Sequence, residues 1–289
     1  MKKKQINSET RTDSIQTAEL RQAALHWLAE SDAKSKAAGV RRLAQAWAAG
    51  EVVLDAGADV QATLPVPGHP ARPELVAPHL VTRRAMNTPE GRAVLIHALV
   101  HIEFNAINLA LDAVWRFPGM PPAYYADWLK VADEEALHFT LLAEHLQRLG
   151  YAYGDFTAHS GLWDMAVRTQ HDVLARMALL PRTMEARGLD VTPGLRAKLV
   201  QAGDVAAGPI LDIILRDEIG HVAIGNRWFN YLCGQRALEP LAAYASLAAE
   251  LRAPLLRGPF NLEARRAAGF SEQELALLGT DNTSGAVSH

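Results

Sequence analysis

The feature that most constrains the fold is a motif that occurs twice, a glutamate followed three residues later by a histidine. The two copies are Glu135 with His138 and Glu218 with His221. Residues three apart lie on the same face of an α-helix, so each copy directs one carboxylate and one imidazole into the same small volume. A single copy says little, because a chain with 11 histidines contains such a match easily by chance.

Each copy of the motif follows another glutamate at nearly the same distance. Glu103 stands 32 residues before Glu135, and Glu185 stands 33 residues before Glu218. The chain therefore repeats one arrangement 82 residues later: a helical hairpin with a glutamate on its first helix and the motif on its second. This internal repeat predicts two similar helical hairpins.

Four segments have the apolar periodicity and the boundary residues of long helices. Thr88 suits an N-cap and Pro89 the first helical position. We expect Pro181 to kink the third helix, and Gly203 and Pro209 to divide the fourth region. Alternating β-type patterning is absent, so the sequence predicts an all-α fold. The expected helices span approximately residues 88–116, 122–150, 160–188 and 192–234.

The remaining residues are expected to flank this central part. Prolines at high density suit neither a helix interior nor a central strand, so we interpret the stretch after the first helices as an extended arm. A break in the N-terminal helices is expected around Asp32 to Gly39, and a short helix at about Pro240 to Ala253. The predicted division is a disordered tail (1–17), N-terminal helices and a proline-rich arm packed on the bundle (18–87), a four-helix bundle (88–234), and a C-terminal helical extension with a disordered end (235–289).

All four glutamates lie within apolar stripes that face the predicted core. Glu103, for example, shares its helical face with Ile96 and Ile107, and Glu218 shares its face with Ile214 and Val222. A buried carboxylate without a partner costs roughly several kcal/mol. No comparable set of arginines or lysines shares these stripes, so two divalent cations are the expected partners.

One glutamate from each of two helices, with Glu-x-x-His from each of two others, is the ligand set of di-iron and di-manganese carboxylate bundles. The sequence therefore predicts a ferritin-like four-helix bundle. Oxygen-rich ligands suit iron or manganese better than structural zinc. We expect two Fe ions as the cofactor, with Mn at one or both positions as the alternative. The six predicted metal ligands are Glu103, Glu135, His138, Glu185, Glu218 and His221.

Acidic residues beside the motifs are candidates for orienting the ligand imidazoles. Asp217 and Glu134 directly precede the motif glutamates and lie one turn from His221 and His138 respectively. An exposed surface charge is an equally good interpretation of both. His101 is a third candidate for this outer layer, although it lies off the ligand stripe. The sequence leaves open the roles of His101 and of two further histidines, His97 and His171.

Composition indicates a soluble globular protein, with 49% hydrophobic and 21% charged residues. The net charge of −3 provides no overall attraction for nucleic acid or an anionic membrane. Cys233 is the only cysteine, which excludes an intrachain disulfide or a cysteine-based metal cluster. We identify no signal peptide and no membrane-spanning stretch, so a cytoplasmic location is expected.

The chain also resembles a bacterial family of uncharacterised ferritin-like proteins, over most of its length and with no departure at the six expected ligand positions. The resemblance implies a ferritin-like fold and a di-iron site, but no reaction, because that family has none assigned. A more distant similarity links such proteins to the tRNA hydroxylase that oxidises a prenylated adenosine, which is analogy at the level of the fold. The stretches that carry the resemblance are His101–Glu103, Glu135–His138, Met184–Asp190, Leu215–Asn226 and Gly258–Asn261.

The predicted function is an oxygen-activating oxidoreductase, a non-haem di-iron oxidase or oxygenase that uses dioxygen to oxidise a small organic substrate. The alternatives are a ferroxidase or other metal-handling protein, an enzyme similar to the tRNA-modifying hydroxylase, and a binding protein with structural metals. An apolar channel to the metals would favour the oxidoreductase. A large symmetric shell would favour the metal-handling protein, and a closed, redox-silent site would favour the binding protein. No membrane partner is expected, and nucleic acid is not favoured as a partner, although tRNA is not excluded. The sequence identifies no electron donor and leaves open whether the chain forms a homodimer.

Overall fold

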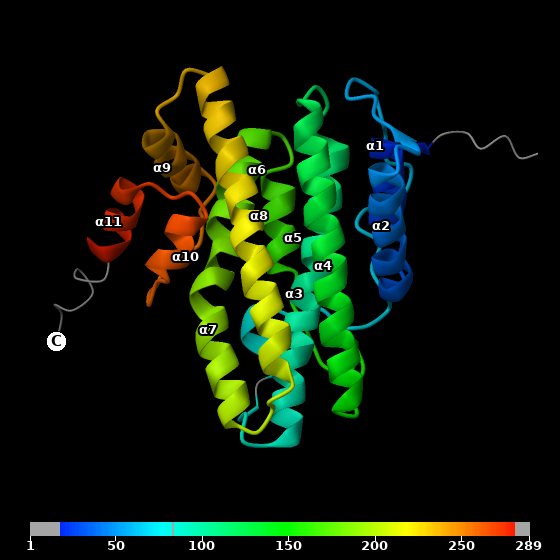
Figure 1. Cartoon of the computed structure of the whole chain (residues 1–289), viewed down its shortest axis with the longest axis vertical. Helices are drawn as coiled ribbons and strands as arrows, with labels where there is room; N and C mark the ends of the chain where they lie inside the picture. The colour runs from blue at the N-terminus through cyan, green and yellow to red at the C-terminus, as the bar shows by residue number, and fades with distance from the viewer. Residues whose placement is uncertain (1–17, 83, 281–289) are drawn as a thin grey trace, which may run out of the picture.

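Long helices that run side by side form the centre of the structure, and shorter helices cover two of its flanks (Figure 1). The computed structural model describes residues 18–82 and 84–280. The packing joins α3 to α4, α7 to α8, and α4 to α8. Apart from two short strands, this part of the chain confirms the predicted all-α fold. The central long helices are α3 (Pro89–Arg116), α4 (Pro122–Arg148), α7 (Ala186–Gln201) and α8 (Ala207–Gln235).

The first hairpin, α3 and α4, has the boundaries that its sequence predicts. The Thr88 side chain accepts a hydrogen bond from the amide of Gly91, as an N-cap should, and Pro89 occupies the first helical position. Between the helices Gly119 has φ +76°, and Gly150 after α4 has φ +87°. Both values lie in the left-handed region that glycine adopts without a steric penalty, so the chain turns there.

The predicted third helix, 160–188, is wrong in its continuity. It is divided into α5 (Gly161–Arg168), α6 (Val173–Leu179) and the π-helical segment η2 (Leu180–Glu185), and the helix then continues as α7. Asp172 caps a new helix start by accepting from the amide of Leu174. The kink expected at Pro181 takes the form of the wider π-helical turn of η2, because proline cannot donate the regular helical hydrogen bond.

The predicted start of the fourth helix at Thr192-Pro193 is also wrong, because Pro193 lies inside α7. Proline has no N–H for the carbonyl four residues earlier, which belongs to Leu189. The side-chain amide of Asn261 donates to that carbonyl at 3.2 Å and replaces the missing bond. The division predicted at Gly203 is confirmed, because its φ of +94° separates α7 from α8, whereas Pro209 lies in the first turn of α8.

The N-terminal helices cover one side of the bundle. Helix α1 (Leu20–Ala29) packs on α3, and α2 (Ala33–Ala48) packs on α4. The break between them is narrower than expected, since Asp32 already caps α2. Strands β1 (Ala18–Glu19) and β2 (Val52–Val53) pair in parallel, and the proline-rich segment that follows contains the short 3₁₀ helix η1 (Pro78–Leu80).

The C-terminal helices cover the opposite flank (Figure 1). Helix α9 (Pro240–Glu250) packs on α6 and α8, and α10 (Leu262–Ala267) packs on α7 and α8. The sequence did not predict the last helix, α11 (Glu272–Thr280). The predicted disordered tail (1–17) and the last residues of the predicted disordered end (281–289) lie outside the described residues, and the division into domains stays a prediction.

Helix α3 corrects the expectation that the chain has no stretch able to span a membrane. Among the described residues it is the one helix long and apolar enough to cross a membrane, with a mean hydropathy of 1.6 in its most apolar window. However, 78% of that window is buried inside the structure. Its apolar character is therefore that of a helix in the core of the structure.

Gly225 sets how closely α8 approaches η2. A Cβ atom at this position would lie 2.3 Å from the Cβ of Pro181 and 2.5 Å from its Cγ. Such distances are far shorter than a van der Waals contact, and the proline ring cannot rotate away. Glycine is therefore required here for the segment that ends in Glu185 to pack against α8.

We expect Gly225→Ala to lower the free energy of unfolding by about 1–3 kcal/mol, because the added methyl group overpacks the contact with Pro181. Denaturant unfolding followed by circular dichroism would measure the change. Gly220→Ala on the same helix is the matched control, since its Cβ would meet nothing within 4 Å. The control is expected to be neutral or stabilising. Equal effects of the two substitutions would contradict the packing argument.

Lys36 connects the N-terminal helices to the bundle although it is completely buried. Its ammonium group donates to the carbonyls of Leu28 at 3.2 Å and Gly68 at 3.1 Å, and to the side-chain oxygen of Asn108. Burial lowers the pKa of Lys36 to about 7, against the weaker opposing effect of Glu30. The unfolded chain, with an ordinary lysine, binds this proton up to a much higher pH.

The free energy of unfolding is therefore expected to rise with pH above pH 7, by roughly 1 kcal/mol per unit, while the unfolded state alone keeps the proton. Below pH 7 this contribution is constant. Lys36→Met should remove that slope, whereas Lys34→Met, at an exposed position of the same helix, should keep it. Denaturant unfolding at several pH values between about 7 and 9 measures the difference. The same slope in both variants would rule out Lys36 as its source.

Candidate metal centre

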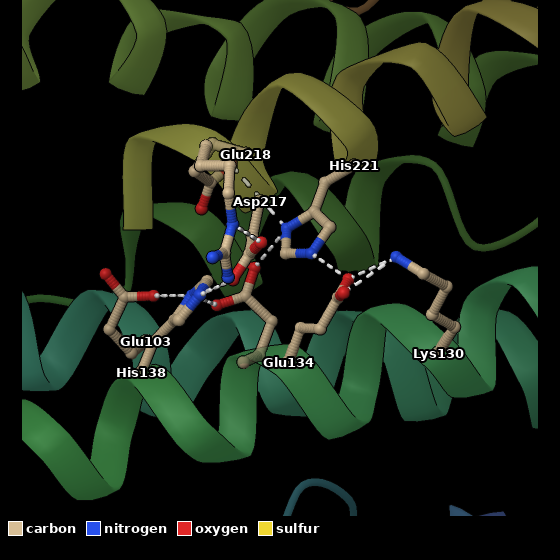
Figure 2. A network of polar contacts seen from close by, with 9 residues as sticks. Glu103, Lys130, Glu134, His138, Asp217, Glu218 and His221 are labelled. Atoms are coloured by element: carbon tan, nitrogen blue, oxygen red, sulfur yellow. Dashed lines mark hydrogen bonds and ion pairs between the residues drawn. The ribbon is translucent and has the colours of Figure 1, made fainter. Parts of the chain in front are cut away.

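The predicted ligands come from four helical segments, and Figure 2 shows Glu103, His138, Glu218 and His221 among them. Glu103 lies in the middle of α3, Glu185 ends η2, and α4 and α8 each contribute one Glu-x-x-His motif. Five of the six side chains are almost completely excluded from solvent. Their exposed fractions are 4% for Glu103, 0% for Glu135, 0% for His138, 8% for Glu218 and 0% for His221.

Glu135 lies between the two motif histidines. One of its carboxylate oxygens is 3.0 Å from Nδ1 of His221, and the other is 3.4 Å from Nδ1 of His138. Glu103 reaches within 3.6 Å of Nδ1 of His138, and Glu218 within 3.8 Å of Nδ1 of His221. One ligand atom each from Glu103, Glu135, His138 and Glu218 lie within 4.8 Å of one another. This buried group could hold a metal ion.

Each of the six predicted ligands has a buried polar atom without a hydrogen-bond partner. Buried polar groups in native proteins are nearly always paired, so a cluster of unpaired atoms at one place calls for an explanation. Bound cations would accept these lone pairs, and the residues therefore fit a metal site. The unpaired atoms are Oε2 of Glu103, both oxygens of Glu135, Nδ1 of His138, Oε2 of Glu185, Oε2 of Glu218 and Nδ1 of His221.

The opposite nitrogen of each imidazole is held by a carboxylate from the other motif helix. Nε2 of His138 lies 3.2 Å from Asp217 on α8, and Nε2 of His221 lies 3.0 Å from Glu134 on α4. The sequence placed each acid one turn from the histidine of its own helix, whereas the structure pairs them across the helices. With Nε2 bonded to an acid, Nδ1 is the nitrogen that faces the carboxylate cluster (Figure 2).

Two basic residues that the sequence analysis missed complete this outer layer. Lys130 donates to Glu134 at 2.6 Å, and Arg216 donates to Asp217 at 2.8 Å. The spacing of four between Lys130 and Glu134 on a helix is a signal that could have predicted the first pair. Both basic side chains are exposed, so the imidazoles and the acids Asp217 and Glu134 lie between the buried carboxylates and the surface cations.

The charges within the cluster shift the pKa values of its members. Burial opposes a charged imidazole, but the carboxylates of Glu103 and Glu135 raise the pKa of His138 to about 11. Burial and then the neighbouring Glu218 and Glu135 raise the pKa of Glu185 to about 8. Without metal, protonated imidazoles are thus the cations beside the carboxylates. A metal must displace these protons, so its affinity should increase with pH.

Glu185 reaches the cluster from an irregular part of the backbone. It is the last residue of η2, and π-helical turns often occur at functional sites. It does not belong to the four-residue group of ligand atoms described above. Its carboxylate is nevertheless close enough for Glu218 and Glu135 to raise its pKa, and its Oε2 is buried.

The structure does not bring His101 to the ligands. Its Nδ1 lies 2.9 Å from the hydroxyl of Tyr153 and its Nε2 lies 3.1 Å from the carbonyl of His159, so the expected place in the outer layer is not supported by its contacts. His97 accepts from the amide of Gly154 at 3.0 Å. His171, whose role the sequence left open, is exposed.

Comparison with known proteins places the chain in a family. The family model described as "Protein of unknown function (DUF455)" matches residues 29–276. A Haemophilus influenzae protein named "Uncharacterized protein" is 53% identical over 213 residues, which cover 71% of this chain and 74% of the relative. No solved structure matches the chain.

We expect Asp217→Asn to weaken metal binding by about 10- to 100-fold. The carboxylate of Asp217 orients the imidazole of His138 and makes it more basic, and the substitution removes both effects. Anaerobic titration with Mn²⁺, with free Mn²⁺ measured by electron paramagnetic resonance, would give the affinities. Asp212→Asn on the same helix is the matched control, because this exposed acid pairs with Arg196 outside the cluster. If both variants bind Mn²⁺ as the wild type does, Asp217 has no role in the site.

Proposed function

Because the chain belongs to the DUF455 family, whose function is unknown, we propose its function from the metal centre itself: an oxygen-activating oxidoreductase with a dinuclear iron site. The observation that carries this proposal is the set of buried, unpaired ligand atoms contributed by all six predicted residues. Four carboxylates and two imidazoles are more donors than one ion requires. The same donor set occurs in di-iron and di-manganese carboxylate bundles, which supports a ferritin-like architecture for this fold.

The position of Glu135 supports two ions rather than one. Its two oxygens face different histidines, so each oxygen and its neighbouring Nδ1 can serve a different ion. The rings of His138 and His221 have centroids 5.8 Å apart, which leaves the imidazoles side by side and separate. In this arrangement Glu135 would serve both ions, Glu103 would join His138 in holding one ion, and Glu185 and Glu218 would join His221 in holding the other.

The donors favour iron, with manganese as the alternative at either position, because carboxylate oxygens outnumber nitrogens and no thiolate is present among the six ligands. Two reduced irons would supply part of the electrons that reduce dioxygen, and the small organic substrate would supply the rest as it is oxidised. The chain contributes a buried, shielded site and two histidines whose orientation is fixed by Asp217 and Glu134. We propose that the enzyme acts in the cytoplasm.

The covered flanks of the bundle favour an oxidoreductase over an iron-storage subunit. Helices α1 and α2 lie on one side and α9, α10 and α11 on the other (Figure 1). A cage-forming protein needs the outer faces of its bundle for contacts with other subunits. Similarity to the tRNA-modifying hydroxylase stays an analogy of fold and carries no further argument.

The first test is metal content after expression with added iron, followed by anaerobic reduction and timed exposure to oxygen. We expect about two irons per chain, the number that this ligand set binds in di-iron bundles. Oxidation by oxygen should produce an oxo-bridged or transient absorption band. Failure to bind any metal, even after reconstitution with iron and manganese, would remove the basis of the proposal.

Glu135→Ala and Glu218→Ala should each abolish binding of at least one metal and lower the melting temperature of the metal-loaded protein, because bound metal stabilises the native state by mass action. Metal analysis and thermal unfolding would measure both effects. Glu144→Ala is the control, since Glu144 is an exposed glutamate on α4. Two metals per chain in both site variants would show that the ligand assignment is wrong.

A further inference from the structure

Glu185 marks the side on which the metal centre is least covered. It is the one predicted ligand that is partly exposed, whereas the other five are buried. Three residues further along the chain, a Cβ atom added at Gly188 would meet nothing within 4 Å. Residues three apart share a helical face, so open space lies within one turn of this ligand.

Helices α3 and α7 both extend from the metal centre in the same direction. Glu103 lies in α3, Glu185 directly precedes α7, and beyond them the guanidinium of Arg92 donates to the carbonyl of Ala202 at 3.1 Å. Between these points each helix packs more closely on other partners than on the other one. These partners are α4, α1 and α5 for α3, and α8, η2 and α10 for α7. The two helices therefore border a loosely packed strip that begins at the metal centre.

Helix α3 presents apolar side chains to this strip. Leu95 and Leu99 are partly exposed and lie on the helical face of Arg92, the residue that reaches the end of α7. Ile102 is 45% exposed, although the rest of α3 beyond its first turn is buried or partly buried. An apolar side chain thus lies exposed directly before the predicted ligand Glu103.

A matching apolar stripe lies on η2 and α7. Asp190 of α7 binds Arg265 of α10, and Arg196 binds Asp212 of α8, so these two residues mark the faces that pack on those helices. The stripe lies on the remaining side at helical spacing. Neither stripe contains a charged residue. The members of the second stripe, all partly exposed, are Met184, Gly188, Val191 and Leu195.

The strip is closed at both ends, which limits what it can hold. Helix α5 packs on both α3 and η2 and closes one end, and the bond between Arg92 and Ala202 closes the other. The stretch of α3 from Arg92 to Glu103 is roughly 16 Å long at the rise of an α-helix. A strip of this length suits a small molecule rather than a protein partner, whose interface buries about 800 Å² on each side.

We propose that the organic substrate has an uncharged apolar chain, which binds between the two stripes and reaches the metal centre beside Glu185. The inference rests on the oxidoreductase function proposed above and adds to it a class of substrate and a route of approach. Burial of the chain against Leu99, Ile102 and Val191 would drive binding. The open space at Gly188 would receive the part of the chain nearest the ions.

The test uses the full chain as purified and a series of linear alcohols from pentanol to octanol, in ligand-observed NMR titrations. We expect saturable binding of octanol, and an affinity that rises about three- to fourfold with each methylene group, the gain from burying one CH₂. Binding of these probes needs neither metal nor turnover. Failure to bind them would overturn this proposal and leave the dinuclear site standing, whereas failure to load metal would not affect the titration.

A variant that fills the space beside Glu185 locates the binding. Gly188→Leu should weaken octanol binding at least about tenfold, because the leucine side chain occupies the space that the probe needs. Gly194→Leu is the matched control, an exposed glycine on another face of α7 whose Cβ would also meet nothing within 4 Å. We expect this control to bind octanol as the wild type does. Equal affinities in the two variants would overturn the proposal.

A second copy of the chain is the alternative occupant of the two stripes. Light scattering after size-exclusion chromatography would compare the wild type with Ile102→Glu, which places a charge on the exposed part of the first stripe. We expect the same mass for both proteins. A wild-type dimer that becomes a monomer in Ile102→Glu would assign the stripes to a subunit interface and overturn the proposal.

Discussion

The constraint on which the rest of this structure depends is a group of carboxylates buried at one place, those of Glu103, Glu135 and Glu218, with Glu185 beside them. Like charges that share a site repel one another, and burial makes each more costly. The carboxylates are surrounded by layers of alternating charge. The imidazoles of His138 and His221 lie next to them, followed by the acids Asp217 and Glu134 and then by exposed basic residues. The innermost layer still has unpaired atoms, and that shortfall is the physical argument for metal.

The same hydrogen bonds that orient the imidazoles also fix α4 against α8. Asp217 of α8 holds a histidine of α4, and Glu134 of α4 holds a histidine of α8. A shift of one helix along the other would break both bonds and would separate Glu135 from His221. The geometry of the site and the packing of the two hairpins therefore support each other, as expected of a site built on rigid elements.

The flanking helices contribute to the bundle beyond covering it. Asn261 donates to the carbonyl of Leu189 in α7, which Pro193 cannot reach because it has no N–H. Arg265 binds Asp190 of the same helix. On the other flank Lys36 connects the backbone at Leu28 and Gly68 to α3. These contacts make the extensions part of the folded unit, because each satisfies a buried polar group that the central helices leave unpaired.

The sequence by itself determined the elements whose causes are local. The N-cap of α3 and the turn glycines after α3 and α4 act within a few residues, and a spacing of three fixes that Glu135 and His138 share one helical face. The repeat of this pattern identified the residues that the structure brings together at the cluster. Only the tertiary structure decided the crossed pairs of Asp217 and Glu134 and the π-helical turn before Glu185. Those features depend on the rotation and register of one helix against another, which packing contacts such as Gly225 against Pro181 set and no local pattern encodes.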